Sequence, residues 1–363
     1  MYNYDYSGRI ERYRKLMHNE GVSLSFFSPG SDMFYLSGVK IDTYERLTLL
    51  AIGQDTVSLI VPRLEVPRVE DGYVQRGEIL DWPDGEDPYV IARSLLPRDG
   101  KISVSGGMRV ADFLRLAGDI ETSRILISDY ILSRLRRKKD ELEIRNIAKA
   151  VDISERALED TLNELSPGMS EAAAAAKLKE NFSSLGSREA FSTIVSFGKN
   201  SASPHHEPSS DALKEGDAVL FDFGAAYMGY ASDTTRTFFL GKAPSEFRSI
   251  YEAVKEAQQA AIDRAVPGAT YSDVDKAARE VIARAGYGKY FIHRTGHGLG
   301  IDVHEPPYVV SGNEERVEDG HVFTIEPGIY IPGKGGVRIE DTVYIDGGIC
   351  KTFNKFRKEI MVL

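Results

Sequence analysis

The second half of the chain contains a weak internal repeat, and this feature constrains the fold more than any other. Two helical stretches end in similar Pro-Gly turns, one at Pro167 and one at Pro267, 100 positions later. The strand-like segments that follow match at an offset of 104, because EGDAVLFDFG aligns with DGHVFTIEPG. Two copies are too few for a solenoid of stacked repeats. We therefore expect two halves related by a pseudo-two-fold axis within one layered α/β domain.

Each copy of the repeat places two acids at matched positions. Asp222 aligns with Glu326, and a little later Asp233 aligns with Glu340. Asp222 and Glu326 stand in apolar, strand-like surroundings, where an unpaired charge is costly to bury. Four separate surface or salt-bridged acids are the alternative interpretation. The repeat favours a common site at the pseudo-two-fold axis, with two carboxylates from each half.

The histidines are concentrated in the same region. Six of the seven lie between positions 205 and 321, and three of these stand in the segment HRTGHGLGIDVHEPP. A single histidine is more often structural, but a cluster in one domain with four such acids favours a metal site. One imidazole and four carboxylates suit Mn²⁺ or Co²⁺, with Zn²⁺ possible. Five ligands are many for one ion, so we expect two divalent ions, an arrangement that activates water for hydrolysis.

The length of 363 residues predicts two domains. Near residue 134 the run RLRRKKDELEIRNIAKAVDI opens a long amphipathic helix. We expect an α/β organisation with one domain over residues 1–131 and a second over residues 132–363. The first begins with a helical pattern over residues 7–20 and continues with short β-rich segments between turn residues, namely SLSFFSP, MFYLSGV, LTLLAIG, TVSLIVP and KISVSG.

Composition narrows the class of protein. The net charge of −10 and the pI of about 5.4 argue against a general nucleic-acid-binding protein. The basic run Arg134–Lys139 stands beside Asp140 and Glu141, which favours a solvated helix start over a nucleic-acid contact. The single cysteine, Cys350, allows no disulfide within the chain and predicts a reducing compartment. The sequence reads without a secretory signal or a long apolar run, so we expect a cytoplasmic protein with no membrane partner.

Two other kinds of chemistry fit the sequence poorly. The glycines of Gly296-x-Gly298-x-Gly300 do not have the spacing of a dinucleotide-binding loop and do not open a βαβ unit. Cys350 lies near the C-terminus beside a lysine, which is a weak setting for a nucleophile, and the chain has no G-x-S-x-G elbow.

Five segments carry a resemblance to a known family and cover most of residues 135–363: SFGKNSASPHH (196–206), VLFDFGAAYMGYASDTTRTF (219–238), PGATYSDVDKAAREVI (267–282), HRTGHGLGIDVHEPP (293–307) and FTIEPGIYIPGKGGVRIEDT (323–342). They resemble the pita-bread (creatinase/aminopeptidase) metallopeptidases, specifically the group of Xaa-Pro dipeptidase (prolidase) and aminopeptidase P. The stretch MFYLSG resembles part of the N-terminal domain of that group, which methionine aminopeptidases lack. The resemblance implies an N-terminal creatinase-like domain followed by a pita-bread catalytic domain.

The resemblance also implies roles for the five ligands. Asp222 would bind the first metal ion, and Asp233 and Glu340 would bridge the two ions. His297 and Glu326 would complete the second metal site. Glu326 would in addition act as the general base towards the water or hydroxide that bridges the ions.

Further family positions surround these ligands. His205 and His304 would contact the substrate at the scissile bond and stabilise the charged intermediate. His293 and Arg338 match positions close to the metals, as supporting or substrate-binding groups. The remaining two histidines of the cluster match no family position and are interpreted as structural: His206 and His321.

The expected activity is hydrolysis of the Xaa-Pro peptide bond, with one departure from the family pattern. Many prolidases carry an arginine that holds the carboxylate of the dipeptide where this chain has Tyr308, and a neutral phenol cannot replace a guanidinium. Tyr308 therefore favours aminopeptidase P activity on longer peptides. The alternatives are a non-peptidase hydrolase or a non-catalytic binding protein on the same fold. The family also implies a homodimer.

Overall fold

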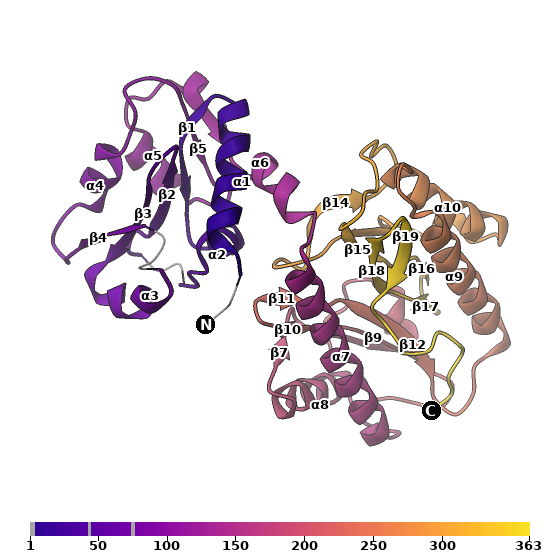
Figure 1. The fold of residues 1–363 in the computed structure, drawn as a ribbon. Helices are drawn as coiled ribbons and strands as arrows, with labels where there is room; N and C mark the ends of the chain where they lie inside the picture. Colours follow the sequence, from indigo (N-terminus) through magenta and orange to yellow (C-terminus); the bar gives the residue numbers. More distant parts are fainter. Residues whose placement is uncertain (1–3, 43–44, 74–76) are drawn as a thin grey trace. The chain divides into compact units, whose positions relative to one another are not determined.

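The structure is a computed structural model that describes residues 4–42, 45–73 and 77–363 (Figure 1). The chain divides into two compact units, Met1–Arg136 and Arg137–Leu363. The expected boundary after residue 131 falls inside helix α6 (Asp129–Arg136), which belongs to the first unit. Within the described ranges, no helix is both long and apolar enough to cross a membrane.

The first unit is built on a mixed six-stranded sheet. In spatial order its strands are β4 (Glu78–Trp82), β3 (Val57–Pro62), β2 (Leu49–Gly53), β1 (Val22–Phe27), β5 (Lys101–Val104) and β6 (Ile125–Ile127). The connecting helices are α1 (Tyr6–Asn19), α2 (Ser31–Ser37), α3 (Val66–Tyr73), α4 (Pro88–Ser94), α5 (Val110–Ala117) and α6. Strands β1, β2 and β3 pair antiparallel, whereas β4, β5 and β6 each join by a parallel pairing.

One predicted β-rich segment of this unit is wrong. Residues of MFYLSGV form helix α2, and Met33 and Leu36 are buried in it. A run this short and this apolar has no clear period, so it does not distinguish a buried strand from a buried helix. Gly38 ends the helix in a left-handed conformation, with φ 74°, which favours glycine.

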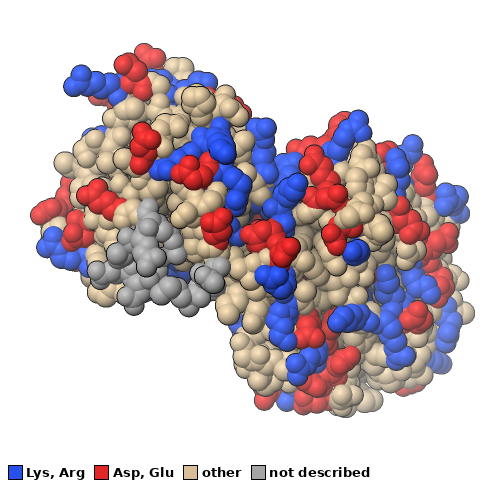
Figure 2. All heavy atoms as spheres, in the orientation of Figure 1, with Lys and Arg blue, Asp and Glu red and all other residues tan. Residues whose placement is uncertain are grey.

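The prediction for the start of the long helix is also wrong. Helix α7 (Glu141–Glu164) begins only after Asp140, which caps it together with Glu143 in a reciprocal capping box. The basic run instead ends α6 and forms the connection that follows. Its side chains pair with acids, since Arg137 contacts Glu315. On the face drawn in Figure 2, basic and acidic side chains are intermixed over the described residues.

The second unit consists of two helix pairs outside several small sheets (Figure 1). The helices are α7, α8 (Glu171–Ser184), α9 (Ser245–Arg264) and α10 (Tyr271–Arg284). One of the two larger sheets has three strands, in the order β12 (Thr234–Phe239), β9 (Ala218–Phe223) and β8 (Ile194–Phe197). The other has five strands, in the order β14 (Glu305–Val309), β13 (Gly296–Gly298), β15 (Val322–Ile325), β18 (Asp341–Asp346) and β19 (Ile349–Thr352). The smaller sheets are β11 (Tyr230–Ala231), β10 (Ala225–Tyr227), β7 (Arg188–Glu189) and β16 (Gly328–Ile331), β17 (Gly335–Arg338).

The internal repeat is present in the backbone of this unit. In the first half, the amide of Gly168 donates to the carbonyl of Leu213 at 2.9 Å. In the second half, Gly268 donates to Val317 at 3.1 Å, at positions offset by 100 and 104. Each half also has its own apolar core, in which one helix pair covers one of the larger sheets. The predicted pseudo-two-fold organisation is therefore confirmed, and the two sheets converge on one region.

Candidate metal centre and active site

A cavity of about 580 Å³ lies within the second unit. Nine of the ten site residues predicted from the sequence line it. The complete lining is Phe191, Ser192, Ile194, Pro204, His205, Asp222, Asp233, His293, Arg294, His297, Val303, His304, Glu326, Arg338 and Glu340. Of the predicted site residues, Tyr308 is the one that this lining does not include.

Strand ends from both halves of the repeat deliver the four acids. In the first half, Asp222 stands in β9 opposite Thr235 of β12, and Asp233 immediately precedes β12. In the second half, Glu326 follows β15 and Glu340 precedes β18, whose ends pair antiparallel. The amide of Glu340 donates to the carbonyl of Thr235 at 3.1 Å, which joins the two halves at the site.

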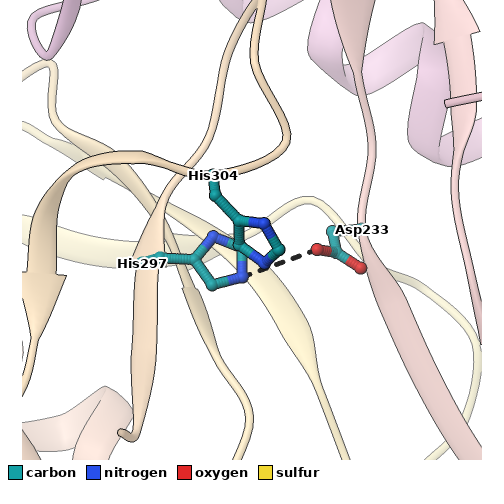
Figure 3. Close-up of side chains that lie close together, drawn as sticks. All are labelled: Asp233, His297 and His304. Atoms are coloured by element: carbon teal, nitrogen blue, oxygen red, sulfur yellow. Dashed lines mark ion pairs between the residues drawn. The ribbon is translucent and has the colours of Figure 1, made fainter. Parts of the chain in front are cut away.

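The potential metal-binding atoms of these side chains are close together. Three overlapping groups each have one potential ligand atom per residue, and within a group these atoms lie within 4.8 Å of one another: Asp222, Asp233 and Glu340; His297, Glu326 and Glu340; and Asp233, His297 and His304. His297 Nε2 is 3.2 Å from Glu326 Oε1 and 3.6 Å from Asp233 Oδ2. Figure 3 shows the third group, in which the three side chains point toward one another.

The electrostatics of the site fit bound divalent cations. Burial and the repulsion of neighbouring carboxylates raise the pKa of Asp233 and that of Glu340 well above their usual ranges. Oδ1 of Asp222 and Oδ1 of Asp233 are buried, and neither has a hydrogen-bond donor among the described residues. Buried carboxylate oxygens are normally paired or bound to metal. An oxygen-rich donor set of this kind matches Mn²⁺-type ions better than thiolate-preferring ones.

Glu326 differs from the other acids. Burial alone would raise the pKa of Glu326, but hydrogen bonding to His297 and the nearby cationic groups hold it at about 2. Thr324 Oγ1 also donates to Glu326 Oε1 at 3.3 Å. Glu326 is therefore ionised at neutral pH, with an oxygen directed into the same cavity as the other ligands.

Arg338 connects the ligands to a tyrosine that sequence reasoning missed. Its guanidinium forms an ion pair with Asp222 and donates to Tyr330 Oη at 2.9 Å. Burial raises the pKa of Tyr330 to about 12, so its hydroxyl stays protonated and can donate to His293 Nε2, 2.8 Å away. The other ring nitrogen of His293 then donates to the Arg294 carbonyl at 2.7 Å. No spacing signal in the sequence connects Tyr330 to this network.

The two histidines predicted to contact substrate both line the cavity. Both side chains are partly open to solvent: His205 is on a loop, and the ring of His304 packs edge-to-face against His297 with centroids 4.1 Å apart. Burial and the nearby His297 and Arg294 lower the pKa of His304 to about 4, so its imidazole is neutral at pH 7. His304 also belongs to one of the three groups of candidate metal-binding atoms, a position that sequence reasoning did not give it.

Tyr308 lies beside a cation. It stands in β14 opposite His297 and is 37% exposed. The guanidinium of Arg294 lies over its ring, 4.5 Å from the centroid, in a cation–π contact. Because Arg294 also lines the cavity, a positive charge is present near the place where the sequence led us to expect only a neutral phenol.

Comparison with known proteins identifies the family. The model of metallopeptidase family M24 matches residues 145–347, and the creatinase/prolidase N-terminal domain matches residues 9–138. The chain is 35% identical over 364 residues to an Xaa-Pro dipeptidase of Lactobacillus delbrueckii subsp. lactis, with 98% of each chain covered.

Solved structures agree with this result. A prolidase from Thermococcus sibiricus has a TM-score of 0.94 at 37% identity, covering 99% of this chain and 100% of that one. An X-Pro aminopeptidase from Thermotoga maritima has a TM-score of 0.84 at 30% identity, covering 97% and 100%. The expected resemblance to the pita-bread metallopeptidases is confirmed, and the chain belongs to metallopeptidase family M24.

Proposed function

We propose that this protein hydrolyses the peptide bond between an N-terminal residue and proline, using divalent metal ions. The observation that carries the proposal is the meeting of four carboxylates and one imidazole, from both halves of the repeat, in one cavity of an M24 metallopeptidase. The test compares turnover of an Xaa-Pro dipeptide with that of the matching Xaa-Ala dipeptide after loading with Mn²⁺ or Co²⁺. Equal turnover of the two would contradict proline selectivity.

We assign two ions to the site, with Mn²⁺ or Co²⁺ preferred and Zn²⁺ possible. The overlap of the clusters supports this assignment, because Asp222, Asp233 and Glu340 form one group and His297, Glu326 and Glu340 form another. Glu340 belongs to both, and Asp233 lies within 3.6 Å of His297. Both would therefore bridge, while Asp222 would serve the first ion and His297 with Glu326 the second.

Residues of the chain would supply proton transfer, stabilisation of the developing charge and orientation of a metal ligand. Divalent ions held by these ligands would supply Lewis acidity towards the scissile carbonyl and would lower the pKa of a bound water towards neutrality. Glu326, being ionised, accepts the proton of the attacking water at its carboxylate oxygen. His304 is neutral and His205 faces the same space, so each can donate a hydrogen bond to the oxygen on which charge develops. Arg338 keeps Asp222 oriented through their ion pair.

Apolar side chains of the cavity support the preference for proline. Phe191, Ile194 and Val303 line it beside the polar cluster. The nitrogen of the scissile Xaa-Pro bond is a tertiary amide with no N–H to donate. A slot for the ring is therefore of more use than a hydrogen-bond acceptor, and these side chains provide apolar surface of that kind.

We further propose that dipeptides are preferred over longer peptides and that Arg294 supplies the charge that Tyr308 lacks. Replacement of Arg294 by methionine is expected to lower kcat/KM for an Xaa-Pro dipeptide by about tenfold or more, because a charge-assisted contact to the substrate carboxylate contributes about 1.5–3 kcal/mol. Turnover of an Xaa-Pro-Yaa tripeptide should change less. Arg294→Lys is the matched control, because it keeps the charge. An equal loss for both peptides would favour the aminopeptidase P alternative suggested by Tyr308.

A homodimer is proposed on family grounds, and one cysteine in 363 residues supports a cytoplasmic location. Light scattering at micromolar concentration is expected to give twice the chain mass of 40.3 kDa. A mass equal to that of one chain over this concentration range would contradict the dimer.

A further inference from the structure

One carboxylate outside the metal site collects five hydrogen bonds. Glu171, the first residue of α8, is fully buried. Its Oε1 accepts from the amide of Phe197 at 2.7 Å and from Asn200 Nδ2 at 2.9 Å. Its Oε2 accepts from His206 Nε2 at 2.7 Å, and from the amide and hydroxyl of Ser209 at 3.0 and 2.6 Å. Four of the donors belong to the segment that runs from Asn200 to Ser209.

This segment carries His205 into the active site, and only its first three residues belong to regular structure, the short 3₁₀ helix Gly198–Ala202. Residues 203–211, all of them described, contain no helix or strand. His205 lies between two tethers, since the Pro204 carbonyl accepts from Arg338 Nη1 at 3.5 Å and the next residue, His206, contacts Glu171. The contact with Glu171 is the shorter of the two, at 2.7 Å against 3.5 Å.

The second half of the repeat provides an internal comparison. Tyr271 occupies the position equivalent to Glu171, and its amide makes the equivalent backbone contact, to the carbonyl of Glu315 at 3.0 Å. Among the described residues, its hydroxyl forms a hydrogen bond with one partner, His321 Nδ1, at 2.8 Å. The active-site loop of that half ends in strand β14, which pairs with β13 and so fixes His304 by a sheet. The half that lacks such strand pairing is the half that has the buried carboxylate.

We propose that Glu171 is a positioning residue that holds His205 at the scissile bond, acting through His206 and the loop from Asn200 to Ser209. This inference rests on the proposed function, in which His205 stabilises the developing charge. His206, which the sequence led us to interpret as structural only, is in this arrangement the link between the anchor and its catalytic neighbour.

Glutamine is the informative replacement for Glu171. Both carboxylate oxygens of Glu171 accept hydrogen bonds from donors. In glutamine an NH₂ group replaces one of these oxygens, so its two N–H bonds would face at least two donors and those hydrogen bonds would be lost. The side chain keeps its volume, and the loop loses its anchor. Glu171→Gln is expected to lower kcat for an Xaa-Pro dipeptide by about 10- to 100-fold, the effect of a displacement near 1 Å at a reacting centre.

A double-mutant cycle with His205→Ala distinguishes positioning from general destabilisation. If Glu171 acts through His205, the variant Glu171→Gln/His205→Ala will be no slower than His205→Ala alone, within about twofold. Effects that multiply would overturn the proposal. Tyr271→Phe is the matched control, since it removes the equivalent contact in the other half. An equal fall in kcat for Tyr271→Phe and Glu171→Gln at similar melting temperatures would also overturn it.

Hydrogen exchange supplies a measurement that does not depend on turnover. The backbone N–H groups of the non-proline residues within 203–209 should exchange faster in Glu171→Gln than in the unaltered protein, while residues 313–317 of the other half stay protected. Unchanged exchange over residues 203–209 would overturn the proposal. If His205→Ala retains full activity, the role of His205 in the proposed function fails, and exchange still decides whether Glu171 holds the loop. Should Glu171→Gln not fold, Ser209→Ala removes one donor and is tested in the same three ways.

Discussion

Replacing Glu326 by glutamine is expected to lower kcat for an Xaa-Pro dipeptide by about 10²–10⁴-fold or more. Glutamine has nearly the same shape but cannot accept the proton of the attacking water. The pKa of Glu326 is held low, at about 2, so this carboxylate is ionised and can accept a proton at neutral pH. Glu326 forms polar contacts with His297 and Thr324, and glutamine can keep a hydrogen bond to each, so the fold should survive the change.

The control for this experiment is Glu314→Gln, an exposed residue of the same unit outside the cavity lining. It should leave turnover unchanged. Metal content must be measured alongside kcat, because Glu326 is also a proposed ligand. A variant that keeps its metal and loses its activity would assign the loss to the missing base. Turnover close to that of the unaltered protein would show that another group accepts the proton.

The internal repeat made the acid cluster predictable. Residues at equivalent places in two copies of a strand pair must lie symmetrically about the axis that relates the copies, so Asp222 and Glu326 had to approach one another if the halves pack face to face. In the structure both side chains line the same cavity, although they come from two different sheets. A pattern of matched positions therefore carried information on tertiary structure.

The groups that support the cluster could not be predicted in this way. Tyr330 contacts Arg338 because the hairpin of β16 and β17 folds back on itself, and Gly328 pairs with Arg338 across it. Arg294 reaches Tyr308 across two strands whose register includes a bulge. Such contacts depend on side-chain directions that neither hydrophobic period nor residue type determines. A similar limit applies to the short apolar run MFYLSGV, whose residues are compatible with a buried strand but form helix α2.

Addition of Mn²⁺ to the metal-free protein is expected to raise the melting temperature of the second unit by about 5–10 °C and to restore activity lost in a chelator. A ligand at about 100 times its Kd contributes about 2.7 kcal/mol, and about 1 kcal/mol shifts the melting temperature of a unit this size by about 2–4 °C. The physical source is the cluster itself, in which Asp222, Asp233 and Glu340 share a buried space with few donors.

The gain in melting temperature should increase with pH. Burial and mutual repulsion raise the pKa values of Asp233 and Glu340 in the folded, metal-free protein, so these groups favour folding at low pH, and that contribution is lost as the pH rises from about 4 through their raised values. A divalent cation replaces the protons and removes this loss. Melting curves with chelator and with Mn²⁺ should therefore separate more at about pH 8 than at about pH 6. In Asp233→Asn the separation should shrink, whereas the exposed Asp319→Asn should leave it unchanged. Cations bound among ionised carboxylates compete with protons for the same oxygens, so metal binding at this cluster must depend on pH. If the two curves of the unaltered protein coincide at both pH values, the cluster does not bind the ion.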